Sequence, residues 1–319
     1  MIALRFKDKQ LDVVNVPKPA GEGEAVVRVT MSGICNTDLE IVRGYAGFEG
    51  TIGHEFVGVV ESVPENSSVA VGQRVVGEIN AGCGHCALCL AGDPRHCPNR
   101  TVLGIVGRDG AHAEFLRLPV VNLLPVPDEI PDYQAVFTEP LAAACGILER
   151  VQITPEMRVA VIGDGKLGLL CSQVIKLTGA PVLLVGKHPE KLRLAGAREI
   201  ETAHIEEARK LAHEFDLAVE ASGSESGFAL ALDLLRPHGT LVLKSTFHGA
   251  TRMNAARLVV EEISVVGSRC GRFAPALELL SQHAVDVESL ISEEYALSDG
   301  LRAIERAAAH GVLKVLLKP

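Results

Sequence analysis

Short apolar runs alternate with turn-forming residues over the first part of the chain. The runs at 11–16 and 25–30 have the length and flanking residues of antiparallel strands. The same pattern returns over 104–126, where we expect one strand at 111–115. After that the pattern becomes helical, and a helix is predicted to begin at Pro140, because proline is favoured at the first helical position.

The pattern changes in the second part of the chain. The apolar run 159–162 breaks at glycines and resumes at helical spacing, and a second apolar run follows at 181–185. This order indicates a strand, a tight turn, a helix and a further buried strand. Later runs predicted as strands are 215–220, 239–243 and 263–267.

The turn after the first of these strands carries the spacing Gly163-x-Gly165-x-x-Gly168. The first glycine permits the sharp turn, the second lets backbone approach a pyrophosphate, and the third lets the helix pack on its strand. Lys166 and Leu167 would begin that helix, whose free N–H groups favour phosphate. We predict dinucleotide binding here; the alternative is an accidental glycine-rich turn.

Composition narrows the possible partners. The chain has 319 residues, enough for about two domains, and its net charge of −9 comes with no basic stripe. Nucleic acid and anionic lipid are therefore not expected, and small molecules are favoured. No segment reaches the length of an apolar membrane span, and the first ten residues lack a signal-peptide pattern. We expect a cytoplasmic protein.

Four of the eight cysteines lie close together, at Cys83, Cys86, Cys89 and Cys97. Four thiolates at this spacing predict a closed, tetrahedral structural zinc site, and nearby glycines would let the loop fold back on one ion. The alternative is a set of unpaired surface cysteines. His85 and His96 lie within the cluster and are interpreted as solvated loop residues.

A second metal site is suggested by Cys35 and His54. A catalytic zinc site uses three protein ligands and leaves a fourth position open. The alternative is a buried core thiol and a hydrogen-bonded loop histidine. Glu139, before Pro140, is by itself explained as a favourable charge at a helix N-terminus.

These motifs occur in an order that resembles the zinc-containing medium-chain dehydrogenases, the family of alcohol, sorbitol and threonine dehydrogenases. The motifs that carry the resemblance are Cys35-x-Thr37-Asp38, Gly53-His54-Glu55, the four cysteines, Glu139-Pro140, the glycine turn, Val219 to Gly223 and Val266 to Arg269.

The resemblance implies an α/β fold, with a β-rich GroES-like catalytic domain and a doubly wound Rossmann domain. The expected boundaries are 1–142 for the catalytic domain, 143–269 for the Rossmann domain and 270–319 for the return to the catalytic domain. The family architecture places the active site between the domains, and family members usually form homodimers or homotetramers.

The resemblance also assigns roles. Cys35, His54 and Glu139 would hold the catalytic zinc, with Glu55 as a carboxylate that can enter or leave the metal shell. Asp38 would orient His54. Thr37 would pass the substrate proton onward; Glu40 stands where many alcohol dehydrogenases have a relay histidine.

The remaining cofactor residues follow from the Rossmann pattern. The resemblance implies that Lys244, Ser245, Thr246 and Arg269 line the nicotinamide side, with Ser222 in the same expected site; the alternative is that the first four are strand-end polar residues that bind no ligand. At the end of the second strand, NAD enzymes carry an acid that binds the ribose hydroxyls. Here Gly186, Lys187 and His188 replace it; we interpret Gly186 as open space and the cations as favouring NADP, with NAD possible.

We therefore predict a zinc-dependent oxidoreductase that transfers a hydride between a secondary alcohol or polyol and NAD(P). The alternatives are a zinc-independent quinone or enone reductase and a non-catalytic nucleotide-binding protein on the same fold. Tyr45, Phe48 and Ile105 are candidate walls of the substrate pocket.

Overall fold

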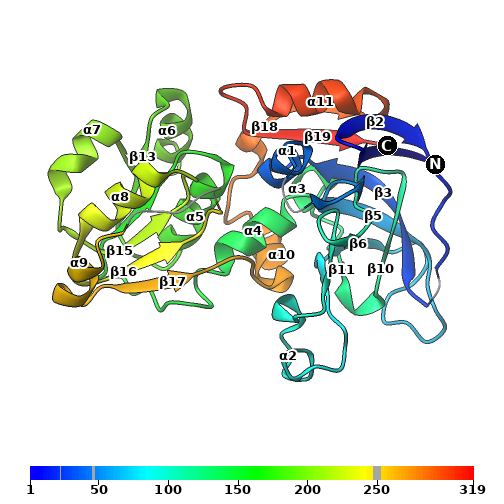
Figure 1. Ribbon diagram of the computed structural model, residues 1–319, viewed down its shortest axis with the longest axis horizontal. Helices are drawn as coiled ribbons and strands as arrows, with labels where there is room; N and C mark the ends of the chain where they lie inside the picture. Colours follow the sequence, from blue (N-terminus) through cyan, green and yellow to red (C-terminus); the bar gives the residue numbers. More distant parts are fainter. Residues whose placement is uncertain (22, 45–46, 247–252) are drawn as a thin grey trace. The chain divides into compact units, whose positions relative to one another are not determined.

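The computed structural model describes residues 1–319 except 22, 45–46 and 247–252. The chain divides into two compact units (Figure 1). Unit 1 contains residues 1–139 and 273–319, and unit 2 contains residues 140–272. None of the helices in the described part of the chain is long and apolar enough to cross a membrane.

Unit 1 is organised around a seven-stranded sheet in the order β11-β6-β5-β3-β19-β18, with β10 paired to β3. The central strand β3 is mostly buried: β5, β10 and β19 pair with its two edges, and most of its side chains lie in the core. The strands of this sheet are β3 (Ala25–Gly33), β5 (Glu55–Ser62), β6 (Arg74–Gly77), β10 (Phe115–Leu118), β11 (Leu123–Pro125), β18 (Ile291–Ala296) and β19 (Lys314–Lys318).

Two three-stranded sheets complete the β-structure of unit 1. They are formed by β1 (Ile2–Lys7), β2 (Gln10–Asn15) and β4 (Gly50–Thr51), and by β7 (Asn80–Ala81), β8 (Thr101–Leu103) and β9 (Gly107–Arg108). The helices are α1 (Asn36–Val42), α2 (Ala87–Leu90), α3 (Asp132–Ala135), α10 (Phe273–Ser281) and α11 (Gly300–Ala307), and α4 (Thr138–Cys145) spans the chain position where unit 1 ends.

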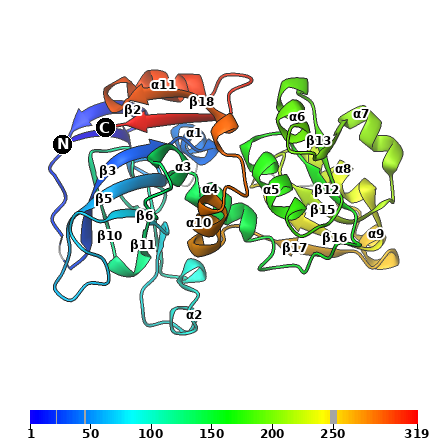
Figure 2. The same ribbon diagram turned by 180° about the vertical axis from the view of Figure 1, so that it is seen from behind.

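Unit 2 is a six-stranded parallel sheet in the order β14-β13-β12-β15-β16-β17. Figure 2 shows this sheet with its helices from the second side. The strands β12, β13 and β14 follow one another toward one edge of the sheet, and β15, β16 and β17 follow one another toward the other edge. Doubly wound folds bind their ligands where the strand order reverses, which is between β12 and β15 here. The elements are β12 (Val159–Ile162), α5 (Lys166–Lys176), β13 (Val182–Gly186), α6 (Pro189–Gly196), β14 (Glu201–His204), α7 (Ile205–Ala208), β15 (Phe215–Glu220), α8 (Glu225–Leu234), β16 (Leu235–Leu243), α9 (Ala255–Val260) and β17 (Ser264–Gly267).

The apolar pattern explains the core of unit 2. Every residue of β12 and β13 is buried, as expected for parallel strands covered on both faces. Helices α5 and α8 pack against these central strands. The predicted strand, turn, helix and strand of this region are therefore confirmed.

Two local predictions need correction. The segment 111–115 is not one strand: β10 begins only at Phe115. Its first residues are tied elsewhere, since the N–H groups of Ala111 and His112 donate to Gly53 and Ile52 and Ala113 makes an isolated bridge to Ala3. The helix expected to begin at Pro140 begins at Thr138.

Candidate metal and cofactor sites

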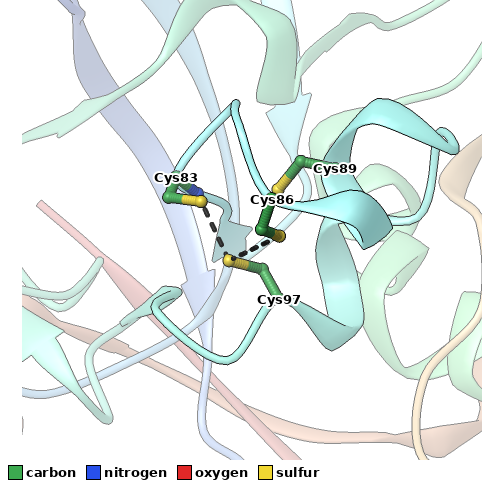
Figure 3. Close-up of side chains that lie close together, drawn as sticks. All are labelled: Cys83, Cys86, Cys89 and Cys97. Carbon is green, nitrogen blue, oxygen red and sulfur yellow. Dashed lines mark hydrogen bonds between the residues drawn. The ribbon is translucent and has the colours of Figure 1, made fainter.

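The four clustered cysteines converge in the loop that carries α2 (Figure 3). Their sulfur atoms all lie within 4.8 Å of one another. The backbone folds tightly here: Gly84 and Gly92 have positive φ, and a Cβ at Gly82 would lie 2.8 Å from the sulfur of Cys89. The glycines are therefore needed to bring the sulfurs together.

The donor set fits a closed zinc site. The N–H of Cys83 donates to the sulfur of Cys97 at 3.4 Å, and the sulfurs of Cys86 and Cys97 are 3.7 Å apart. A hydrogen bond from the backbone of His85 lowers the pKa of Cys83 to about 6, whereas desolvation raises the pKa of Cys89 to about 11, so that Cys83 favours the thiolate and Cys89 would need the metal to hold its thiolate form. His85 and His96 are exposed, as predicted. The ring of His85 forms a hydrogen bond with the backbone oxygen of Cys83, and the ring of His96 forms one with the carboxylate of Asp93.

A second cluster joins Cys35, His54 and Glu55. Cys35 precedes α1 as its N-cap residue, His54 immediately precedes β5, and Glu55 is the first residue of β5. One ligand atom of each lies within 4.8 Å of those of the other two. Three unlike donors from two segments match the open type of zinc site.

Asp38 organises this cluster. Its carboxylate accepts hydrogen bonds from the N–H groups of Cys35 (2.8 Å) and Gly53 (3.1 Å) and lies 3.4 Å from Nδ1 of His54. Burial alone would raise its pKa, but the charges of His54 and His112 hold that pKa well below the usual value. Asp38 is therefore ionised, and its charge faces Nδ1 of His54 without a hydrogen bond between them.

Glu55 is held from a distant part of the chain. Both it and Lys314 of β19 are fully buried, and Nζ of Lys314 donates to Oε2 of Glu55. Oε1 of Glu55 is buried and has no hydrogen-bond partner within the described part of the chain. A buried carboxylate oxygen of this kind fits a metal ligand, because an unsatisfied one is costly.

The remaining candidate residues of the catalytic site are Glu139, Thr37 and Glu40. Glu139 is half-buried in the first turn of α4 and does not belong to the set of ligand atoms within 4.8 Å that the described residues provide. Oγ1 of Thr37 lies 3.8 Å from the sulfur of Cys35. Glu40 forms an ion pair of 2.7 Å with Arg43 on the exposed side of α1.

In unit 2 the glycine turn has the geometry that its spacing predicts. A Cβ at Gly163 would lie 2.7 Å from the carbonyl oxygen of Ala221, and one at Gly168 would overlap the carbonyl oxygen of Gly163. Nothing lies within 4 Å of a Cβ built at Gly165. Lys166 and Leu167 form the first turn of α5, whose N–H groups face this turn.

The expected open space at Gly186 is not there. A Cβ at Gly186 would lie 2.6 Å from Cγ of Asp164, so the carboxyl group of Asp164 fills that space. The sequence interpretation failed because the acid at this strand end comes from the glycine turn and not from β13 itself. Lys187 is exposed, and His188 is half-buried.

The two serines predicted for the cofactor site, Ser222 and Ser245, form hydrogen bonds with a buried carboxylate. Glu220 accepts a hydrogen bond from Oγ of Ser222 at 2.7 Å and another from Oγ of Ser245. Lys244 is also buried and donates to the carbonyl oxygens of Ser268 and Arg269 at 3.0 Å each. These contacts fix the carboxyl-terminal ends of β15, β16 and β17. Arg269 is exposed. Thr246 is the last described residue before 247–252.

Two of the three candidate pocket walls are described. Phe48 and Ile105 line a surface cleft of about 920 Å³ in unit 1, together with charged residues such as Arg5 and Asp109. Neither Cys35 nor His54 is among its lining residues. Tyr45 lies outside the residues that the structure describes.

Comparison with known proteins decides the family. The Alcohol dehydrogenase GroES-like domain matches residues 21–128, and the Zinc-binding dehydrogenase family matches residues 167–282. Sorbitol dehydrogenase of Halalkalibacterium halodurans is 31% identical over 95% of this chain and 94% of its own. The chain belongs to the zinc-containing medium-chain dehydrogenase family.

Solved structures of this family share the fold over the whole chain. A protein described as a zinc-binding dehydrogenase from Sinorhizobium meliloti 1021, bound to NADP, has a TM-score of 0.90 at 28% identity and covers 100% of this chain and 99% of its own. A protein from Escherichia coli CFT073 that is described as a short chain alcohol dehydrogenase, complexed with NADH, gives the same TM-score, identity and coverage.

This dehydrogenase is therefore an enzyme that transfers a hydride between an alcohol and a nicotinamide dinucleotide in a zinc-dependent reaction. The predicted family, fold class, type of reaction and cofactor classes are confirmed. The roles of individual site residues stay predictions.

Sequence reasoning missed four polar residues that shape these sites, and each acts through tertiary contacts. They are Lys314, His112, Asp164 and Glu220. A lysine within the apolar closing strand is the only one with a visible signal, because a charge at a buried strand position needs a partner.

Proposed function

We propose that this dehydrogenase oxidises small secondary alcohols or polyols, or reduces the corresponding carbonyl compounds, with NADP as its preferred dinucleotide. The observation that carries the proposal is the convergence of Cys35, His54 and Glu55 on one point, with their ligand atoms within 4.8 Å of one another. Three protein ligands leave a coordination position for a substrate oxygen. The sorbitol dehydrogenase relative supports a polyol.

The proposed ligands are Cys35, His54 and a carboxylate. The geometry favours Glu55, whose Oε1 is buried without a partner in the described part of the chain. Glu139, which the family resemblance assigns to the metal, stays a proposed ligand from the first turn of α4. Zinc analysis of Glu55→Gln and Glu139→Gln separates the two, because the variant that lacks the third ligand should lose the more metal.

A bound zinc ion supplies Lewis-acid polarisation of the alcohol or carbonyl oxygen, and a nicotinamide supplies the hydride acceptor or donor. The chain itself moves the proton. We assign Oγ1 of Thr37, close to the sulfur of Cys35, as a relay: it accepts the proton of the substrate hydroxyl while its own hydroxyl proton passes on toward solvent, and the reverse reaction returns a proton by the same route. Asp38 keeps the His54 ring in one orientation throughout.

The NADP preference rests on charge. The residues from Gly186 to Pro189 contain no acid, and exposed Lys187 follows the strand end directly. A dianionic 2′-phosphate would be attracted to such a cation. NADPH should therefore bind more tightly than NADH, and Lys187→Ala should reduce that preference. Equal or tighter NADH binding would contradict the cofactor choice.

The substrate proposal is tested by assaying polyols, amino alcohols and simple alcohols with both dinucleotides. We expect turnover of secondary alcohols or polyols that requires bound zinc. Turnover of an enone or quinone by the metal-free enzyme, with none of any alcohol, would contradict the assignment.

We also propose a homodimer or homotetramer in the cytoplasm. The outer strand of the unit 2 sheet, β17, exposes Val265, and the neighbouring helix α9 exposes Val259 and Val260 at 76% and 81%. An apolar sheet edge of this type favours pairing with a second copy. A monomeric mass from light scattering at micromolar concentration would contradict the proposed oligomer.

The proposed cytoplasmic location is supported by the cysteines grouped for metal binding, which suit a reducing compartment.

A further inference from the structure

Asp164 lies between two glycines of the dinucleotide turn, but its side chain is not directed into solvent. Only 9% of the side chain is exposed. Its carboxyl group lies against the end of β13, where a Cβ at Gly186 would be 2.6 Å from its Cγ. Gly186 is therefore required by the position of Asp164, since any larger residue would displace this carboxylate.

The carboxylate of Asp164 is surrounded by donors from the turn after β13. Oδ2 accepts hydrogen bonds from the N–H groups of Lys187 and His188, both at 2.7 Å. Oδ1 lies 2.9 Å from Nδ1 of the His188 ring. Burial would raise the pKa of Asp164, but these hydrogen bonds from His188 and Lys187 hold it below the usual value, so the group is ionised.

The surroundings of Asp164 differ from those expected for the acid that binds ribose at the end of the second strand in NAD enzymes. A carboxylate offers about four acceptor positions, and three donor groups from Lys187 and His188 already approach Asp164. Its negative charge is buried and directed at these donors. The backbone of the turn is thereby wrapped around a fixed anion, and the directions of the Lys187 and His188 side chains are set by it.

We propose that Asp164 is a positioning residue for cofactor selectivity, which holds the turn from Gly186 to His188 in the conformation that binds the 2′-phosphate of NADP. The inference rests on the proposed NADP preference and deepens it. Asp164 acts through the turn and not by touching the phosphate. Its loss should weaken NADPH binding selectively, because NADH lacks the group that the turn contacts.

The test is a fluorescence titration of the whole protein with NADPH and with NADH, which needs no turnover. The informative variant is Asp164→Asn, which keeps the shape but loses the charge that receives three donors. We expect its NADPH dissociation constant to rise about tenfold or more, while the constant for NADH changes less than about threefold. Asp164→Ala should show at least the same loss.

The matched control is Glu190→Gln, which removes one exposed negative charge from the first turn of α6 without touching the turn. It should leave the NADPH affinity unchanged or slightly stronger. Unfolding temperature and zinc content of every variant show that the fold is kept; if Asp164→Ala does not fold, Asp164→Asn decides.

Three results would overturn the inference: equal weakening of both dinucleotides, which indicates a purely structural role; unchanged NADPH binding; or tighter NADPH binding, which indicates that Asp164 repels the phosphate. The cofactor choice itself is judged separately, from the wild-type ratio of affinities and from Lys187→Ala. A wild-type preference for NADPH with an unaffected Asp164→Asn leaves the cofactor proposal intact and removes only the role of Asp164.

Discussion

The four-cysteine cluster and the cluster of Cys35, His54 and Glu55 lie in the same unit but depend on the fold to different degrees. All four sulfurs come from one loop of fifteen residues, 83–97, and three of these cysteines are partly exposed. The second cluster combines residues that follow β3 and begin β5, and its carboxylate is held by Lys314, 259 positions later. One site is local, and the other requires the assembled sheet.

The two clusters differ in what holds their ligands in place, and the difference follows from donor type and burial. Four thiolates can satisfy a zinc ion completely and need few other contacts. Three unlike donors leave a position open for chemistry, so their orientation has to come from neighbours. Buried Asp38 and Lys314 provide that orientation, at the cost of placing charges where they must stay paired.

The comparison is tested most strongly by Cys35→Ser. This change should lower turnover by roughly 1,000-fold or more, because metal polarisation contributes several kcal/mol to the transition state. Dinucleotide affinity, measured by fluorescence, should stay the same, since the glycine turn belongs to unit 2. His54→Ala serves as a second variant. Loss of dinucleotide binding in a folded variant would contradict this division of roles.

The second test removes the distant support. In protein stripped of zinc, Lys314→Met leaves the carboxylate of Glu55 buried and without its cation, which should reduce the free energy of unfolding by about 3–5 kcal/mol in urea titrations. The matched control is Lys318→Met at the exposed end of the same strand, with an expected change within about 0.5 kcal/mol.

Combining Lys314→Met with Glu55→Leu should recover part of that loss, because the unpaired charge is then gone. Wild-type stability in Lys314→Met alone would show that the pair does not support the site.

A smaller effect is expected from Asp38→Asn. The amide keeps the size of the side chain but removes the charge that faces His54, so zinc affinity should fall about 10- to 100-fold in a competition with a chromophoric chelator. Glu40→Gln, on the exposed side of the same helix, is the control and should bind zinc normally. Equal zinc affinities of the two variants would contradict the orienting role of Asp38.

The smallest effect on turnover should come from the local site. Elemental analysis of the fully metallated wild type should give about two zinc ions per chain, and Cys89→Ser should give about one. Turnover should change by less than about threefold, while protease cleavage within the loop increases, because the metal stabilises that loop. A loss of turnover as large as that of Cys35→Ser would erase the distinction between the two clusters.

The sequence was most informative where function is local. The spacing of four cysteines and of three glycines predicts contacts that the structure then has, because each set lies within one turn or loop. The contacts of Asp164 with Lys187 and His188 could not be predicted, since they depend on how β12 and β13 align. The pairing of Glu55 with Lys314 was hidden for the same reason: sequence distance says nothing about which strands become neighbours.

The contact between Glu55 and Lys314 also bears on when each cluster can assemble during protein synthesis. The four-cysteine loop is complete once residue 97 has left the ribosome, so it can take up zinc while most of the chain is still unmade. Glu55 must wait until the strand containing Lys314 is translated and paired with β3. We therefore expect metal loading of the cluster of Cys35, His54 and Glu55 to depend on completion of the sheet, whereas a prematurely terminated chain should still be able to hold zinc in its four-cysteine loop.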